Sequence, residues 1–271
     1  MRIINSLFVS KFLRKISRIV LKPLDLVLIT RDQESEYKGA ILQNIEWDFN
    51  FLLSYSFSDR EQLLKLMPFS KSQLRQDLFV LNSFGFKPNG YFVEFGATDG
   101  KQFSNTFLLE KEFGWKGILA EPAKTWHAQL RKNRAKSIID RRCVWKVSGD
   151  IIQFAETPIP ELSSINHIQN QDEHVYARKD SKLYNVETVS LQNLLVTNNA
   201  PHDIDYLSID TEGSEFEILS SFDFNTFNIK IITCEHNYTE NRDKIYNLLS
   251  QNGYRRVKQE ISLFDDWYVK N

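Results

Sequence analysis

Two glycines close behind an acidic residue form the first candidate binding motif in this chain of 271 residues. Glu94 lies in the apolar run 91–95, and Gly96 and Gly100 follow where that run gives way to a turn. Glycine has no Cβ to clash with a ligand and adopts positive φ easily, so this pattern is typical of a nucleotide-binding first strand. Thr98 occupies the place of the middle glycine in the dinucleotide motif G-x-G-x-x-G. The acidic loop therefore favours a ligand with a cationic, amino-acid-like end, such as S-adenosylmethionine, over a pyrophosphate.

A second carboxylate is predicted at the end of the next strand. Residues 103–113 have the apolar spacing of a helix, and residues 117–120 form a short apolar run that ends in Glu121 and Pro122. An acidic residue there, about 20 residues after the glycine loop, can accept hydrogen bonds from both hydroxyls of a ribose. The alternative is an ordinary βαβ unit in which such acidic side chains only solvate the strand ends.

Acidic side chains also follow two later patterns of buried strands. They are Asp210, Glu212 and Glu215 after residues 204–209, and Glu235, followed by His236, after residues 229–234. Ligands of open α/β sheets bind outside the carboxyl ends of the strands, so we expect these groups to share one rim with the two earlier carboxylates. Glu212 and Glu215 could instead stabilise the first turn of the following helix through its dipole.

Methyl transfer from a sulfonium is an in-line displacement that needs an aligned acceptor and a group to take its proton. The candidate general bases are Asp210, Glu235 and His236, and histidine is the usual choice near neutral pH. The alternative role is a divalent metal site for Mg²⁺ or another divalent ion, with Asp210, Glu212, Glu235 and His236 as ligands. His236 could also simply bond a backbone group at its strand end. No H-E-x-x-H, paired C-x-x-C or EF-hand pattern accompanies these residues.

Several ordered blocks of the sequence resemble the FkbM-type S-adenosylmethionine-dependent methyltransferases. The blocks are residues 93–100, 104–106 with 109–110, 115–122, 209–215, which is similar to that family's Asp-x-Glu-Gly-x-Glu pattern, and 234–237. Blocks in this order and at these intervals are specific, and they extend the resemblance from about residue 72 to the C-terminus.

The resemblance implies a Rossmann-like class I methyltransferase fold, an α/β domain with a mostly parallel twisted sheet flanked by helices and an antiparallel hairpin at its end. It implies that S-adenosylmethionine is the cofactor, held by Glu94, Gly96, Ala97, Thr98, Asp99, Gly100, Asn105, Glu121 and Pro122. The implied activity is O-methylation of a hydroxyl on a small molecule, a glycan or a glycolipid precursor.

The N-terminal quarter is predicted to be a separate helical extension, residues 1–69, ahead of a methyltransferase domain at residues 70–271. Residues 1–22 carry six basic and no acidic side chains, and their apolar residues recur at intervals of three and four. Such a helix could lie on an anionic membrane surface, or dock on its own domain or on a partner subunit. It is too interrupted by charge to span a membrane and lacks the cleavage site of a signal peptide. Residues 158–182 are polar and aperiodic, which favours a loop or lid beside the acceptor pocket.

The composition excludes some partners. The formal net charge is −1, which gives no general attraction to nucleic acid. The two cysteines, Cys143 and Cys234, fall in predicted strands, so we expect a reduced, cytoplasmic compartment, with possible peripheral contact at the inner face of a membrane. No feature of the sequence specifies the oligomeric state.

Two other classes of function stay open at this point. An NAD-binding oxidoreductase would use Glu121 on a ribose of NAD, but the absent middle glycine argues against it. A catalytically silent, membrane-associated interaction module would keep the fold without turnover. The presence of Gly96, Gly100 and Glu121 favours the enzyme.

Overall fold

The computed structural model describes residues 31–165 and 181–271, in two compact units that divide between Leu53 and Ser54. In the first unit the described part is helix α2 (Arg31–Leu53). The amphipathic helix predicted for residues 1–22 lies outside the described residues. In the part of the chain that is described, no helix is long and apolar enough to cross a membrane.

The second unit begins with short helices. These are α3 (Phe57–Leu66), η3 (Met67–Phe69) and α4 (Gln76–Ser83). Helix α3 starts where the Ser56 side chain accepts a hydrogen bond from the backbone of Asp59, which satisfies one free N–H of the first turn. Helix α3 packs against α4 within this unit, so the compact unit begins before residue 70. The start of the methyltransferase domain at residue 70 stays a prediction.

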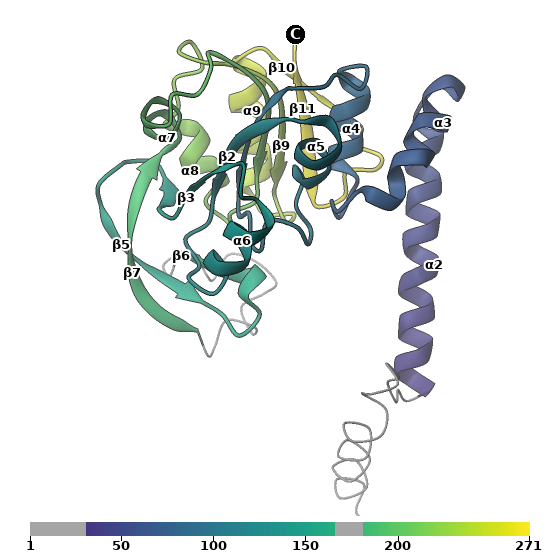
Figure 1. Ribbon diagram of the computed structural model, residues 1–271, viewed down its shortest axis with the longest axis horizontal. Helices are drawn as coiled ribbons and strands as arrows, with labels where there is room; N and C mark the ends of the chain where they lie inside the picture. Colours follow the sequence, from purple (N-terminus) through teal and green to yellow (C-terminus); the bar gives the residue numbers. More distant parts are fainter. Residues whose placement is uncertain (1–30, 166–180) are drawn as a thin grey trace, which may run out of the picture. The chain divides into compact units, whose positions relative to one another are not determined.

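A seven-stranded sheet forms the centre of the second unit, in the order β10-β11-β9-β8-β1-β2-β3 (Figure 1). Its strands are β1 (Tyr91–Phe95), β2 (Lys116–Ala120), β3 (Ile138–Asp140), β8 (Asp203–Ile209), β9 (Asn228–Glu235), β10 (Tyr254–Val257) and β11 (Asp265–Lys270). Among these described strands, only the pairings of β11 with β9 and with β10 are antiparallel. The predicted mostly parallel sheet with an antiparallel hairpin at its end is confirmed.

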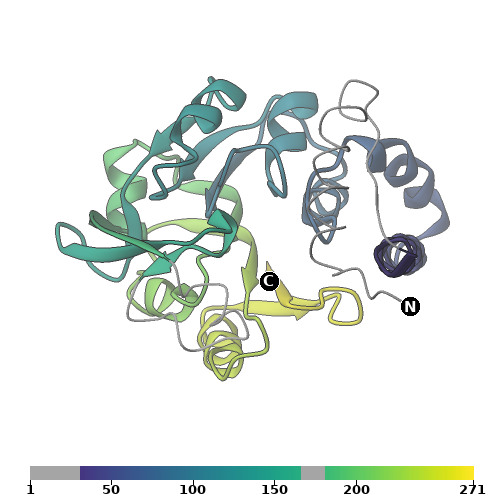
Figure 2. The same cartoon turned by 90° about the horizontal axis from the view of Figure 1, so that it is seen from below.

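Helices cover both faces of this sheet. They are α5 (Phe107–Phe113), α6 (His127–Asn133), α7 (Leu191–Thr197), α8 (Glu215–Ser220) and α9 (Asn241–Gln251). The blue-to-teal helices α4 and α5 lie on one side and the yellow-green helices α8 and α9 on the other (Figure 2). Leucine and isoleucine side chains of α7, α8 and α9 form the main core with alternate residues of the strands, such as Val93 and Phe95.

Helix α5 starts later than the sequence predicts. The expected helix spans residues 103–113, but Phe103 has a φ of 60° and the helix begins at Phe107. The residues in between are held by side-chain hydrogen bonds to Glu94, which compete with helical pairing. The helix ends as expected at Gly114, whose left-handed φ of 68° suits glycine.

A smaller sheet lies beside the main one, in the order β4-β7-β5-β6. Its strands are β4 (Cys143–Trp145), β5 (Ile151–Glu156), β6 (Ser164–Ile165) and β7 (Lys182–Ser190), with the turn η4 (Pro160–Leu162) before β6. It has its own small core around Cys143, Phe154 and Ile165. The stretch 158–182, predicted to be a loop, therefore contributes a 3-10 turn and a strand where it is described, and residues 166–180 lie outside the described part.

Candidate active site

The carboxyl ends of the central strands converge on a cavity of about 390 Å³, a size within the range of small-molecule sites. Gly96, Glu121, Asp210 and Glu235 line it from the ends of β1, β2, β8 and β9. The smaller sheet closes the other side with apolar side chains, namely Val144, Phe154 and Ile165. The cavity thus has one wall of carboxylates and one apolar wall.

Residue 96 must be glycine because of its backbone conformation and a close backbone neighbour, and not because a ligand needs the space. Its φ is 68°, and a Cβ at this position would overlap the carbonyl oxygen of Asp210. Strands β1 and β8 can therefore approach closely at their ends only because residue 96 has no side chain. Thr98 follows with a φ of 46°, and it also lines the cavity.

Glu121 links the loop after β1 to the loop after β2. Its Oε2 accepts a hydrogen bond from the backbone N–H of Thr98 at 2.8 Å, and its Oε1 accepts one from Ala123 at 2.7 Å. Burial raises the pKa of Glu121 to about 7 in spite of these bonds. Each carboxylate oxygen has a second lone pair, so Glu121 can still accept hydrogen bonds from a ligand in the cavity.

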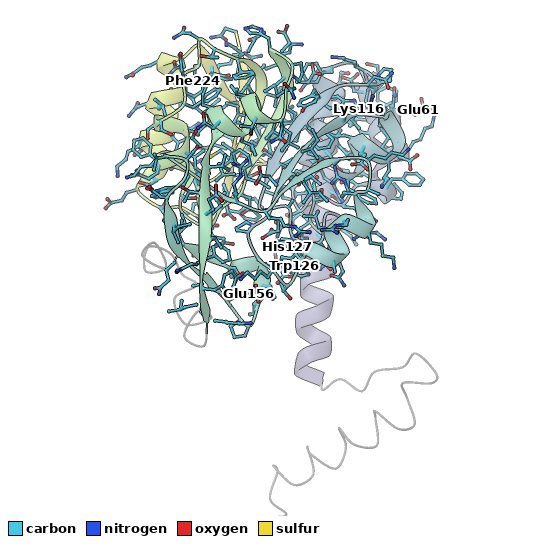
Figure 3. The ribbon with its side chains drawn as sticks, turned by 60° about the vertical axis from the view of Figure 1, so that its left-hand side comes forward. Glu61, Lys116, Trp126, His127, Glu156 and Phe224 are labelled. Atoms are coloured by element: carbon cyan, nitrogen blue, oxygen red, sulfur yellow. The ribbon has the colours of Figure 1, made fainter. Side chains whose placement is uncertain are left out.

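The start of α6 packs below Glu121. The His127 ring bonds the carbonyl oxygen of Glu121 through Nε2 at 2.9 Å. Trp126 packs onto the core of the smaller sheet, and Glu156 at the end of β5 accepts hydrogen bonds from Tyr184 and from the backbone before α6. Trp126, His127 and Glu156 lie close together in the lower part of Figure 3. These contacts fix the end of β2 against the smaller sheet.

Asp210, Glu212 and Glu235 form a carboxylate cluster at the edge of the cavity. One carboxylate oxygen from each lies within 4.8 Å of the others. Burial raises the pKa of Asp210 to about 7, and burial together with Asp210 raises the pKa of Glu235 well above its usual range. Oε2 of Glu235 is buried and has no hydrogen-bond partner among the described residues. The cluster can therefore hold a proton near neutral pH, or take up a cation.

His236 lines a small cavity together with Glu212 and Glu235 but is not part of the group of clustered carboxylate oxygens. Successive side chains of an extended strand point to opposite faces, so His236 turns away from the direction of Glu235. Its Nδ1 accepts a hydrogen bond from the backbone of Tyr238 at 3.0 Å, and its Nε2 lies 3.7 Å from Oδ1 of Asp266. Burial lowers the pKa of His236 to about 4. Among the described residues, His236 is thus outside the three-residue group that could hold a metal ion, and its Nδ1 is occupied by the turn that follows; its role as a base stays a prediction.

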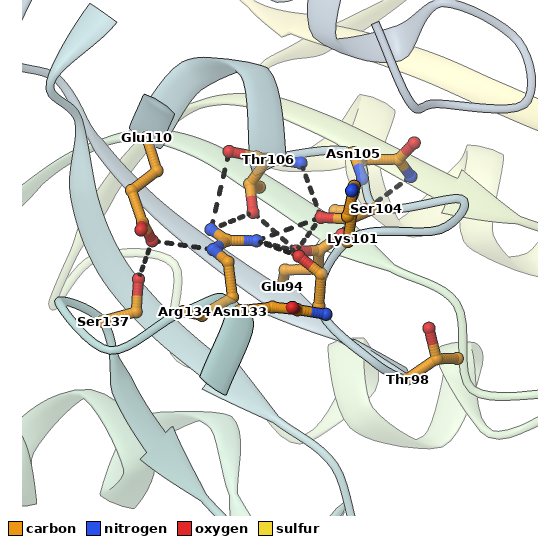
Figure 4. A network of polar contacts seen from close by, with 12 residues as sticks. Glu94, Thr98, Lys101, Ser104, Asn105, Thr106, Glu110, Asn133, Arg134 and Ser137 are labelled. Carbon is orange, nitrogen blue, oxygen red and sulfur yellow. Dashed lines mark hydrogen bonds and ion pairs between the residues drawn. The ribbon is translucent and has the colours of Figure 1, made fainter. Parts of the chain in front are cut away.

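Glu94 points to the face of the sheet opposite Phe95, away from the cavity. Its carboxylate accepts hydrogen bonds from Ser104 Oγ, from the backbone N–H of Asn105 and from Thr106 Oγ1, at 3.0, 2.7 and 2.5 Å (Figure 4). This buried carboxylate therefore shapes the loop from residue 97 to residue 106. Burial raises its pKa, and Arg134 opposes that rise.

The remaining predicted cofactor residues divide into two groups. Gly96, Thr98, Glu121 and Pro122 line the cavity, whereas Glu94, Ala97, Asp99, Gly100 and Asn105 do not. In the second group, Asp99 accepts hydrogen bonds from the backbone of Lys101 and Gln102, which fixes the loop from within. A Cβ at Gly100 would meet the side chain of Arg134 at 2.6 Å, so packing explains this glycine.

Arg134 is a residue that sequence reasoning missed. Its guanidinium is fully buried and pairs with Glu110 at 2.7 Å and with Glu94 at 3.7 Å (Figure 4). It also donates hydrogen bonds to Gly100 O, Ser104 Oγ and Thr106 Oγ1 at 3.1, 3.1 and 2.9 Å. Sequence reasoning also did not predict that the smaller sheet forms the apolar wall of the cavity. The apolar, strand-like residues 151–154 could have indicated it.

A family model for the FkbM methyltransferase domain matches residues 94–256. No match to the sequence was found among curated proteins. Among solved structures, a precorrin-6y C5,15-methyltransferase from Geobacter metallireducens GS-15 is 10% identical, with a TM-score of 0.35 over 67% of this chain and 71% of that chain. A TehB-like S-adenosylmethionine-dependent methyltransferase from Corynebacterium glutamicum is 7% identical, with a TM-score of 0.37 over 78% of this chain and 95% of that chain.

A third solved structure is an S-adenosylmethionine-dependent methyltransferase from Geobacter sulfurreducens in complex with S-adenosylhomocysteine, 8% identical, with a TM-score of 0.36 over 70% of this chain and 67% of that chain. Likenesses this distant carry no argument about substrate. The family assignment depends instead on the match of the domain model, and the fold on the strand order of this chain. The chain belongs to the FkbM methyltransferase domain family and has the Rossmann-like fold of class I methyltransferases.

Proposed function

We propose that this protein transfers a methyl group from S-adenosylmethionine to a hydroxyl of a small molecule, a glycan or a glycolipid precursor. The observation that carries the proposal is the convergence of Glu121 and the carboxylate cluster on one cavity. Glu121 can accept hydrogen bonds from the ribose hydroxyls of the cofactor, and the carboxylate cluster can bind and deprotonate the acceptor hydroxyl. The family alone does not distinguish oxygen from other methyl acceptors.

The residues that line the cavity fit the cofactor. Glu121 offers a carboxylate for the ribose hydroxyls, and Val144, Phe154 and Ile165 offer an apolar surface for the base. Gly96 and Thr98 bring the backbone of the β1 loop to the same space. When bound, S-adenosylmethionine supplies a methyl group on a positively charged sulfur, which leaves with its electron pair.

Asp210 and Glu235 are the groups placed to take the hydroxyl proton. A general base works best when its pKa lies near the working pH, and burial raises the pKa of Asp210 to about 7. Above that pH the carboxylate is ionised and can accept the proton as the oxygen bonds to carbon. Below it Asp210 is already protonated, so methyl transfer should fall as the pH drops through 7.

A divalent cation is the second way in which the cluster can act. Asp210, Glu212 and Glu235 would hold it, since Mg²⁺ prefers oxygen ligands, and the buried, unpartnered Oε2 of Glu235 supports such a role. A cation there would lower the pKa of an acceptor hydroxyl and displace the shared proton. His236 stands outside this ligand set.

The test separates cofactor binding from transfer. Purified protein is incubated with methyl-labelled S-adenosylmethionine and a fraction of hydroxyl-rich small molecules and glycans. The expected product carries label that survives mild base, because methyl ethers resist hydrolysis and methyl esters do not. Asp210→Asn should lower transfer by about 100-fold or more while its affinity for S-adenosylhomocysteine stays unchanged. Base-labile label, or a large loss of affinity in Asp210→Asn, would refute the assignment.

Cytoplasmic location and peripheral membrane contact through residues 1–22 stay predictions. They concern where the acceptor is met and not the chemistry of the cavity.

A further inference from the structure

A groove of about 730 Å³ lies next to the turn that carries Glu212, and none of the three cluster carboxylates lines it. It is formed by the end of β4, the start of α8, the turn after β9 and the start of α9. A small cavity joins the two spaces. It shares Glu212, Glu235 and Asn237 with the cofactor cavity, and Gly213, Thr239 and Asn241 with the groove. That small cavity measures about 10 Å³, room for about one water, so a single hydroxyl of a ligand in the groove could enter it toward Glu212 and Glu235.

The turn after β9, residues 236–239, exposes an aromatic side chain to solvent. Asn237 and Tyr238 have φ values of 42° and 55°, a left-handed conformation that asparagine tolerates and that is costly for tyrosine. Tyr238 is 67% exposed although it is large and aromatic. Backbone strain of this kind persists only where the surroundings enforce it, and it gathers at functional sites.

His236 enforces this turn. Its Nδ1 accepts the backbone hydrogen bond of Tyr238, and its carbonyl oxygen accepts those of Thr239 N and Oγ1 at 2.8 and 2.9 Å. The rings of His236 and Tyr238 meet edge to face, with their centroids 5.3 Å apart. In turn, the backbone N–H of His236 is held by the carbonyl oxygen of Phe264. His236 thus fixes the direction in which Tyr238 points.

The charged groups of the groove balance one another, and both of its lysines have partners. Lys146 pairs with Glu217 at 3.0 Å, and Lys244 donates to Asn241 Oδ1 at 3.2 Å while lying 5.7 Å over the ring of Phe216. The groove contains two lysines and two glutamates, so it offers no net charge for a phosphate or a nucleotide. Apolar ligands would find few partners among these groups. The exposed ring of Tyr238 beside these polar side chains fits a ring compound rich in hydroxyls.

We propose that this groove binds the glycan portion of the methyl acceptor, with Tyr238 stacking on a sugar ring and His236 acting as its positioning residue. The inference rests on the proposed function, since it places a sugar hydroxyl at the Asp210–Glu212–Glu235 cluster. It names the acceptor class as a neutral saccharide of more than one residue, because the groove continues beyond the cluster.

The experiment measures saccharide binding by saturation-transfer NMR on the full chain with excess S-adenosylhomocysteine. The probes are methyl glycosides of hexoses, 6-deoxyhexoses and N-acetylhexosamines, and disaccharides of each. Binding of S-adenosylhomocysteine is measured separately by calorimetry. Tyr238→Ala is compared with Tyr246→Ala, which removes an exposed tyrosine of α9 that does not line the groove.

We expect a disaccharide to give stronger signals than its monosaccharides, and Tyr238→Ala to remove at least about 80% of them, as stacking worth about 1 kcal/mol requires. Tyr246→Ala should keep the signals. His236→Phe should weaken saccharide binding like Tyr238→Ala, and in a transfer assay raise KM for the acceptor while kcat changes little. Absence of saccharide signals while S-adenosylhomocysteine binds, or equal signals in Tyr238→Ala, would overturn the groove proposal alone. Failure of the wild type to bind S-adenosylhomocysteine would overturn the proposed function, and the acceptor role of the groove with it.

Discussion

Replacing Arg134 with methionine should destabilise the folded chain by about 3 kcal/mol. The arginine is fully buried and lies between the carboxylates of Glu94 and Glu110, with Nε 2.7 Å from Glu110 and Nη1 3.7 Å from Glu94. Methionine has a similar length but can neither donate hydrogen bonds nor carry charge. The substitution would therefore leave two buried carboxylates without this cation.

The magnitude follows from what remains after the substitution. Breaking a buried ion pair by removing one partner costs about 3–5 kcal/mol. Glu110 keeps Lys111 at 3.0 Å and the hydroxyl of Ser137, and Glu94 keeps its three hydrogen bonds to residues 104–106. These remaining partners place the expected cost at the lower end of the range.

The cost should also depend on pH. Without Arg134, the folded-state pKa of Glu94 rises further above its unfolded value, because the opposing cation is gone. A carboxyl with a raised folded-state pKa holds its proton more tightly in the folded state than in the unfolded state. The fold is therefore most stable below the unfolded pKa and loses stability as the pH rises from there to the folded pKa. The variant should thus be closer to the wild type in stability at pH 5 than at pH 8.

Urea denaturation followed by circular dichroism at both pH values measures these differences. Arg131→Met is the matched control, since Arg131 is exposed on α6, the helix that ends just before Arg134, and its loss should cost less than about 0.5 kcal/mol. Adding Glu94→Gln to Arg134→Met should recover part of the loss, because it removes the stranded charge. Equal midpoints for Arg134→Met and Arg131→Met would refute the account of this network.

Three further predictions concern other parts of the molecule. Glu121→Gln should flatten the pH dependence of stability. Burial raises the folded-state pKa of Glu121 to about 7, so this carboxyl costs the wild type about 1.4 kcal/mol for each pH unit between its unfolded pKa and 7, and the variant lacks that contribution. Parallel urea midpoints from pH 5 to 8 would contradict this. If the cluster acts through a divalent cation, EDTA should lower turnover and Mg²⁺ restore it; turnover that EDTA leaves unchanged would exclude the metal role and leave the general-base role. Deleting residues 1–22 should abolish flotation with anionic liposomes, and equal flotation of both chains would argue against membrane contact.

The architecture could be predicted from the sequence because its signals are local. The apolar runs at 91–95 and 117–120, each with glycine or proline close behind, become β1 and β2, and the runs that end before Asp210 and His236 become β8 and β9. Parallel strands place their carboxyl ends at one edge, so the gathering of Glu121, Asp210 and Glu235 followed from topology.

The direction of single side chains could not be predicted in the same way. Glu94 and His236 stand next to Phe95 and Glu235, but alternation along the strand sends them to other surroundings. Sequence reasoning placed both in the site because it located strand ends and not strand faces. Arg134 was missed because its partners lie 24 and 40 residues earlier in the chain, and no local pattern marks such a pairing.

The central claim is that the cavity at the strand ends binds the cofactor through Glu121. Calorimetric titration with S-adenosylhomocysteine, with NAD in parallel and Glu121→Ala as the control variant, tests it most directly. The account predicts micromolar binding of S-adenosylhomocysteine, weaker by about 1–3 kcal/mol in Glu121→Ala, and no binding of NAD. Selective binding of NAD, or affinity for S-adenosylhomocysteine that Glu121→Ala leaves unchanged, would contradict it.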